Sequence, residues 1–413
     1  MENKVNSKIP FILITCLFFL WGFAHNLDPI LIPHLKKSFT LSTTQSTLVD
    51  SAVFVAYFIM ALPAGFIMKK WGYKMGIIAG LILFAIGAFL FVPAANNQSY
   101  NYFLFALFVI ACGLTILETA ANPYASSLGD PKTATQRLNL AQSFNGLAVA
   151  LAPIVGAKII LTEGFSEEAL SSMSELARKA ALASEASTVK MPYTLLGIVL
   201  LLIAIAFYFI KLPDIREKGI AEQNGSLLSM FKHHHLKWAV IAQFFYVGAQ
   251  VCVLSLFILY TTVAAHITEL QAAYYLGIGG LAFLIGRFLG TALMKLMAPK
   301  KLLTGYALIC VLLCLVAIYA KGITTVYALI AICFFMSIMF PTIFSLGIHA
   351  LGKDTEMASS LIVMSIVGGA VLPRVFGLIS DHTGNIQLGY YVPLVAFLIV
   401  AYFGWKGSEL KTN

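Results

Sequence analysis

Residues 302–320 read LLTGYALICVLLCLVAIYA, a stretch of nineteen residues without a charged side chain. An α-helix needs about 20 mainly apolar residues to cross the hydrocarbon core of a membrane. Similar stretches recur along the whole chain, in which 60% of the 413 residues are hydrophobic and 11% are charged. Soluble domains carry about 25% charged residues. The sequence therefore predicts an all-α membrane protein with little mass outside the bilayer.

Twelve segments are long and apolar enough to span the membrane. The predicted transmembrane helices are 9–32, 46–68, 75–94, 101–125, 136–162, 192–211, 238–263, 271–295, 302–320, 324–349, 355–379 and 387–405. The first segment is too long for a signal peptide and no small-residue cleavage site follows it, so we expect it to be retained. Because the number of spans is even, both termini are expected on one side.

Basic residues are distributed unevenly between the two sets of loops. The set that includes both termini holds most of the 27 lysines and arginines, and the opposite set holds few, with Lys36 and Lys37 among them. Loops rich in Lys and Arg stay in the cytoplasm, so both termini are predicted to be cytoplasmic. The same distribution accounts for the net charge of +9 without a nucleic-acid partner.

A polar, basic loop at 212–237 divides the chain into two halves of six predicted spans each, 1–211 and 238–413. The halves share short patterns, such as GFIMKK at 65–70 and GTALMK at 290–295. Duplicated halves that enclose a binding site at their interface are a common plan of secondary transporters. The sequence therefore predicts two pseudo-repeated six-helix halves with a site between them.

Acidic residues inside the predicted spans are few, and Glu118 is the most deeply placed. It lies in ILETAANP at 116–123, about one helical turn before Asn122, and Pro123 removes one main-chain hydrogen bond from the helix. A charge at mid-membrane costs at least about 2.5 kcal/mol, so we interpret Glu118 as a group that binds and releases a proton. The alternative is a protonated side chain that only bonds a neighbouring helix.

A second acid, Asp28, precedes Pro29 near the outer end of the first span. It is a candidate for proton coupling, and equally a cap or turn residue at a helix break. His25 and Asn26 lie within one turn of it, and His25 is of a type that titrates near neutral pH. Asp50, at the start of the second span, is interpreted as a helix N-terminal acid favoured by the helix dipole.

Amide and phenol side chains recur at helical spacing in two further spans. They are Asn139, Gln142 and Asn145 in 136–162, and Gln243, Tyr246 and Gln250 in 238–263. Side chains three or four residues apart lie on one side of a helix. Such groups suit the hydroxyl groups of a sugar, which both donate and accept hydrogen bonds. The alternative for each of them is an interhelical hydrogen bond.

The other polar groups of the spans are interpreted structurally. Arg287 is expected to reach the membrane surface or to pair with a loop acid, and Arg374, after Pro373, has no assigned role. The six cysteines lie in apolar stretches without metal-site spacing to histidine, so we expect small buried side chains. No metal site or cofactor is predicted.

Motifs in both halves resemble those of the fucose–proton symporter branch of the major facilitator superfamily, which includes bacterial glucose/galactose permeases. The matching stretches are FFLW at 18–21, PAGFIMKK at 63–70, LETAANP at 117–123, RLNLAQ at 137–142, AQFFYVGAQ at 242–250, GRF at 286–288 and FPTIFSLG at 340–347. The resemblance covers nearly the whole chain.

This resemblance implies that Glu118 is a proton-linked, sugar-contacting acid and that Asn26 and Gln142 line a central cavity. Where the family reads Asn-Leu-Asn-Asp, residues 26–29 read Asn-Leu-Asp-Pro, so the carboxylate stands one position early. One residue rotates a helical side chain by about 100°. The proton-coupling candidates are Glu118 and Asp28. The candidate substrate-binding residues are Asn26, His25, Glu118, Asn122, Asn139, Gln142, Asn145, Gln243, Tyr246 and Gln250.

The predicted function is proton-coupled import of a monosaccharide, L-fucose or a similar sugar such as galactose, by alternating access. We expect a monomer in the lipid of the bacterial inner membrane, with no cofactor beyond the coupling proton. One alternative is sodium-coupled glucose/galactose transport with Asp28 or Asp50 as a cation ligand. A membrane sensor or an enzyme acting on a lipid-linked sugar is disfavoured, because the sequence contains no extra soluble domain, paired acids or metal cluster.

Overall fold

The computed structural model of the chain describes residues 8–25, 39, 48–160, 172–210, 212, 230 and 232–410. All regular secondary structure in these ranges is helical, which confirms the predicted all-α class. Nine helices in the described ranges are long and apolar enough to cross a membrane. Large apolar side chains such as Leu202 and Leu312 are exposed on the outer surface, where a membrane protein faces lipid tails.

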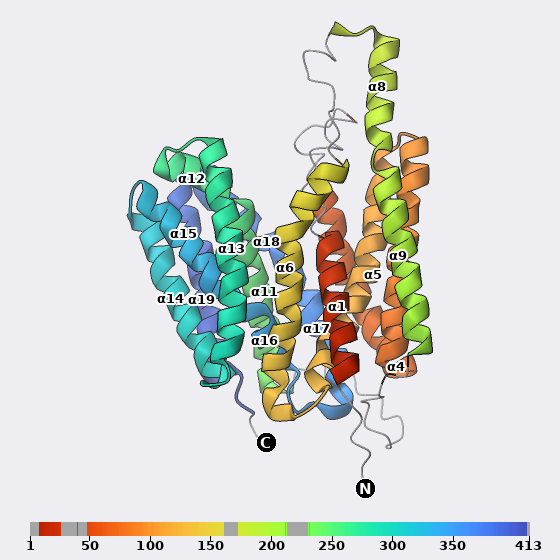
Figure 1. Cartoon of the computed structure of the whole chain (residues 1–413). Coiled ribbons are helices and arrows are strands. Elements are labelled where there is room, and N and C mark those ends of the chain that lie inside the picture. Colours follow the sequence, from red (N-terminus) through yellow and green to blue (C-terminus); the bar gives the residue numbers. More distant parts are fainter. Residues whose placement is uncertain are drawn as a thin grey trace.

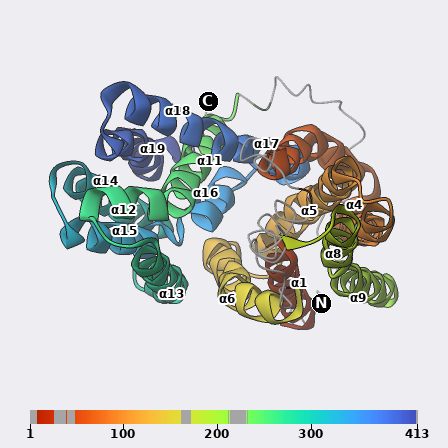
Figure 2. The same cartoon turned by 90° about the horizontal axis from the view of Figure 1, so that it is seen from above.

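The first group of helices lies on one side of the molecule (Figures 1 and 2). It comprises α1 (Lys8–His25), α4 (Leu48–Asn96), α5 (Tyr100–Ser127), the short turn η1 (Pro131–Thr133), α6 (Ala134–Ile160), α8 (Glu175–Ser187) and α9 (Lys190–Phe209). The helix α4 contains the predicted span 75–94 and the span 46–68 from residue 48 onward. They join at Gly72, whose φ of 82° is readily adopted only by a residue without a side chain.

The second group comprises the helices after residue 232. They are α11 (His234–Ser255), α12 (Phe257–Ala265), α13 (Glu269–Leu293), α14 (Pro299–Tyr319), α15 (Ile323–Met336), α16 (Met339–Gly347), η2 (Gly352–Asp354), α17 (Thr355–Met364), η3 (Ser365–Val367), α18 (Gly368–Thr383), η4 (Ile386–Tyr390), α19 (Tyr391–Tyr402) and η5 (Phe403–Gly407).

Three of the predicted spans are broken helices in the structure. The span 238–263 is divided at Leu256, and the span 324–349 ends its first helix at Met336 and restarts at Met339. Pro341 explains the second break, because a proline has no N–H to donate to the carbonyl four residues earlier. The span 355–379 passes through the tight turn η3 immediately before Gly368 and Gly369, and adjacent small residues favour such kinks.

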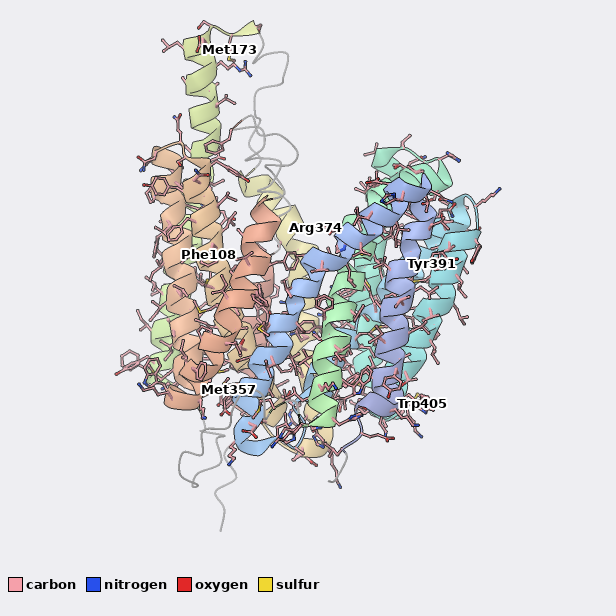
Figure 3. The ribbon with its side chains drawn as sticks, turned by 180° about the vertical axis from the view of Figure 1, so that it is seen from behind. Phe108, Met173, Met357, Arg374, Tyr391 and Trp405 are labelled. Atoms are coloured by element: carbon pink, nitrogen blue, oxygen red, sulfur yellow. The ribbon has the colours of Figure 1, made fainter. Side chains whose placement is uncertain are left out.

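The two groups of helices meet at the end of the molecule where α1 begins and η5 ends. There α4 and α5 pack on α17, and α6 packs on α13 and α16. Toward the other end, marked by α8, the helices of the two groups diverge (Figures 1 and 3). Met357, on α17, lies at the end where the groups meet (Figure 3).

Candidate substrate and proton site

Glu118 lies in the second half of the helix α5 and is 5% exposed. Its carboxyl group is within hydrogen-bonding reach of Tyr57 on α4 and of Asn122, one turn further along α5. Isolated carboxyl groups are costly inside a membrane-spanning bundle, and both neighbours offer hydrogen-bond partners. The position of Glu118 is therefore that of a buried carboxyl group held by polar side chains from two helices.

Asn122 extends this group of side chains to α6. Its Oδ1 accepts a hydrogen bond of 3.0 Å from Nε2 of Gln142, and both side chains are nearly or fully buried. Nδ2 of Asn122 is the donor within reach of the Glu118 carboxyl group, and in this conformation it completes no hydrogen bond within the described part of the chain. We define Tyr57, Glu118, Asn122 and Gln142 as the carboxyl cluster. It contains hydrogen-bond donors and acceptors from three helices of one group.

The other two amides on α6 point to different neighbours. Asn145 is half-buried and donates a 3.2 Å hydrogen bond to the Phe18 carbonyl on α1. Asn139 is fully buried and donates to the hydroxyl of Thr342 on α16, at 3.1 Å, and to the Thr135 carbonyl, at 2.9 Å. Their roles as substrate ligands remain predictions, and in this conformation each forms an interhelical hydrogen bond.

The polar residues of α11 also differ among themselves. Tyr246 is fully buried and its hydroxyl donates a 3.0 Å hydrogen bond to the Met336 carbonyl, where α15 ends. Gln243 is fully buried, and neither atom of its amide has a partner in the described ranges. Gln250 is half-buried. Their sugar-binding roles remain predictions.

Several predicted residues lie outside what the structure describes. Asn26 and Asp28 fall between α1 and α4 in an undescribed segment, and the side chains of His25 and Asp50 are likewise outside the described set. The structure therefore gives no position for the second candidate acid, Asp28. Arg374, which had no assigned role, is exposed on α18 (Figure 3).

Arg287 is the polar residue that sequence reasoning placed wrongly. It is 5% exposed, so it does not reach the membrane surface. Its Nε donates to the Ser337 carbonyl at 2.9 Å, and its Nη1 donates across to the Gln142 carbonyl on α6 at 2.7 Å. Two features of the sequence could have indicated this buried position. Arg287 belongs to the GRF motif, and Pro341 leaves the Ser337 carbonyl without its helical donor.

The sequence model of the Major Facilitator Superfamily matches residues 11–372. The chain belongs to this superfamily. Two curated relatives extend the match to almost the full length. The L-fucose-proton symporter of Escherichia coli is 42% identical over 413 residues, which cover 98% of this chain and 94% of the relative. The glucose/galactose transporter of Brucella abortus is 40% identical over 398 residues, which cover 96% and 93%.

A solved structure matches this superfamily member equally well. The crystal structure of FucP, a Major Facilitator Superfamily transporter, in the outward conformation superposes with a TM-score of 0.92 at 41% identity. The match covers 98% of this chain and 100% of FucP. These relatives are transporters, which confirms the interpretation of this superfamily member as a transporter rather than an enzyme.

The cysteines of this superfamily member follow the prediction with one exception. Five are buried, as expected, but Cys16 is exposed on α1, so the prediction is wrong for that residue. An apolar stretch alone does not determine which face of a helix packs inward. In the part of the chain that the structure describes, no three His, Cys, Asp or Glu residues are placed to hold a metal ion.

Proposed function

We propose that this chain imports a monosaccharide together with a proton by alternating access. The observation that carries the proposal is the buried Glu118, joined to Asn122 and through it to Gln142, in a chain 42% identical to an L-fucose-proton symporter. L-Fucose is the first candidate substrate. Galactose is the second, because a 40% identical relative is named a glucose/galactose transporter.

The carboxyl cluster suits a neutral, hydroxyl-rich ligand. Nδ2 of Asn122 can donate to Glu118 or to a sugar hydroxyl, the Glu118 carboxylate accepts, and the amide of Gln142 does both, as the two-way hydrogen bonding of sugar hydroxyls requires. Protonation of Glu118 in the loaded state makes the occupied site neutral. When the halves rearrange around the occupied site, a neutral site is exposed to apolar surroundings at a lower free-energy cost than a charged one.

We propose the predicted topology with this function. The nine apolar helices, the division of α4 at Gly72 and the additional helices α1 and α6 support twelve spans. The halves are 1–211 and 238–413, joined by the loop 212–237. The excess of basic residues in the loops on the side of the termini supports a cytoplasmic location of both ends in a bacterial inner membrane. We propose a monomer as the working unit.

Transport by the purified protein in proteoliposomes tests the function. With an inward proton gradient, wild-type protein is expected to accumulate L-fucose or galactose. The variant Glu118→Gln is expected to lose accumulation and to retain sugar counterflow, because it keeps a hydrogen-bonding side chain but has no titratable group. Glu409→Gln, which neutralises an exposed acid near the C-terminus, is the matched control and should behave as wild type.

A sodium gradient at constant pH provides the second arm of this experiment. Proton coupling predicts no stimulation of uptake by sodium. Sodium-driven accumulation that persists in Glu118→Gln would show that sodium, and not the proton, is the coupling ion. Undiminished proton-driven accumulation in Glu118→Gln would contradict the assignment of Glu118.

A further inference from the structure

Arg287 is a buried cation held by main-chain carbonyl groups. Its guanidinium donates to the carbonyls of Ser337 and Gln142 and lies over the ring of Phe283, with 4.6 Å between the guanidinium carbon and the ring centroid. Among the described residues, no carboxylate forms an ion pair with it. A buried cation that is not paired with an acid depends strongly on each of its hydrogen bonds.

Two residues, one on α16 and one on α6, allow the Arg287 guanidinium to reach these carbonyl groups. Pro341 leaves the Ser337 carbonyl without its usual helical donor, so that this carbonyl is free to accept from Arg287. On α6, a Cβ atom added to Gly146 would lie 3.7 Å from both Cδ and Nη1 of Arg287. A side chain larger than alanine at position 146 would therefore occupy the path of the guanidinium.

Gln142 connects this cation to the carboxyl cluster. Its main-chain carbonyl accepts from Arg287, while its side-chain amide donates to Asn122, which is within hydrogen-bonding reach of Glu118. One residue of α6 is thus held at its backbone by the second half and at its side chain by the first half. A displacement of α6 relative to α13 would change the position of the amide beside Glu118.

We propose that Arg287 is the positioning residue that joins the carboxyl cluster to the second half and holds the halves together in this conformation. The inference rests on the proposed function, because the cluster is the proposed proton and sugar site. Loss of the bond between Arg287 and the Gln142 carbonyl accompanies separation of α6 from α13, and the Gln142 amide then leaves its place on Asn122. Site occupancy and the arrangement of the halves are in this way linked through one hydrogen bond.

Among the described residues, two other hydrogen bonds join α6 to the second half, and both are between neutral groups. Thr135 and Ser345 share one of 2.9 Å, and Asn139 donates to Thr342 at 3.1 Å. Together with the Gln142 carbonyl they occupy the first third of α6, at the end where the halves meet. Hydrogen bonds in which one partner is charged are roughly twice as strong as neutral ones. Arg287 is therefore expected to contribute more to this interface than either neutral pair.

Distances between spin labels measure the arrangement of the halves without sugar or a proton gradient. Labels at Tyr102→Cys and Leu270→Cys, both exposed, report on the end marked by α8, on α5 and α13. The exposed Cys16 is replaced by serine in this background. Arg287→Gln is expected to lower the ratio of wide to narrow label distances at least tenfold. The reason is the loss of the charged hydrogen bond between Arg287 and the Gln142 carbonyl, which holds the opposite end closed.

Two further variants separate this role from general destabilisation. Ser345→Ala removes a neutral bond across the same interface and is expected to change the ratio threefold or less. Gly146→Val keeps the charge but obstructs the guanidinium, and it should shift the ratio in the same direction as Arg287→Gln. If Arg287→Gln does not fold, the result for Gly146→Val decides. A shift no larger than that of Ser345→Ala would overturn the proposal.

Sugar binding to the same variants tests the link to the carboxyl cluster. Arg287→Gln and Gly146→Val are expected to bind the transported sugar at least tenfold more weakly, whereas Ser345→Ala binds as wild type. Unchanged binding in Arg287→Gln would overturn the link to Glu118. The spin-label result does not depend on transport, so failure of the proposed function and failure of this inference are distinguishable.

Discussion

The side-chain amide of Gln142 on α6 donates a 3.0 Å hydrogen bond to the Asn122 amide oxygen on α5, beside Glu118. This bond holds α5 against α6, the helix that packs on α13 and α16 of the second group. Both side chains are buried: Asn122 has no exposed surface, and Gln142 is 4% exposed. The bond therefore affects both the shape of the candidate site and the packing of the first group of helices.

Gln142→Ala removes this donor and leaves the Asn122 oxygen buried without it. An unsatisfied buried acceptor costs about 1–3 kcal/mol, so we expect a lower free energy of unfolding and sugar affinity reduced at least tenfold. Thermal unfolding in detergent and sugar binding by calorimetry measure the two effects. Asn97→Ala, an amide deletion at the exposed end of α4, should leave sugar affinity unchanged. Equal affinity in Gln142→Ala and wild type would exclude Gln142 from the site.

Much of the fold follows from the sequence because hydrophobic length determines which segments can span a membrane. The predicted spans 101–125 and 302–320 differ from α5 and α14 by three residues or fewer at each end. The burial of Glu118 was also predictable from its apolar surroundings. The roles of the candidate ligands are not tested by position alone, and they stay predictions.

Tertiary contacts account for what the sequence did not reveal. The place of Arg287 depends on the Ser337 carbonyl, freed by Pro341, and on the Gln142 carbonyl in the first group of helices, and no local pattern encodes the second partner. Asn139, Gln142 and Asn145 follow each other at three-residue spacing, yet they bond α16, α5 and α1 respectively. Residues three apart differ by about 60° around a helix axis, enough to reach separate neighbours in a tight bundle.

Gly113 is expected to be intolerant of substitution because α5 and α4 approach closely there. A Cβ atom at this position would lie 2.5 Å from the Phe84 nitrogen and 2.8 Å from the Gly80 oxygen. These are backbone atoms that cannot move independently, so Gly113→Ala should destabilise the protein by about 1–3 kcal/mol through overpacking. Gly277→Ala on α13, where an added Cβ atom would meet no neighbouring helix within 4 Å, is the matched control. Equal thermal stability of the two variants would contradict this close approach.

Lys74 is expected to stabilise the end of α9. Its ammonium donates to the carbonyls of Tyr208 and Ile210, at 2.7 and 2.9 Å, and a cation near the C-terminus of a helix also interacts favourably with the helix dipole. Lys74→Met should lower the free energy of unfolding by about 1 kcal/mol without changing sugar affinity. Lys70→Met, which removes an exposed lysine nearby, serves as the control in thermal unfolding. A stability equal to that of the control would show that the cap contributes nothing.

The two ends of α13 provide a test of membrane orientation. Leu270 and Leu296 are each 83% exposed, one at the end marked by α8 and the other in the turn after α13. With cysteine at one of these positions and Cys16→Ser in the background, a membrane-impermeant maleimide added to intact cells should label Leu270→Cys and leave Leu296→Cys unlabelled. Both should react after the cells are lysed, which controls for accessibility. Because α13 joins loops on opposite sides, labelling of Leu296→Cys alone in intact cells would place the termini outside and reverse the proposed direction of transport.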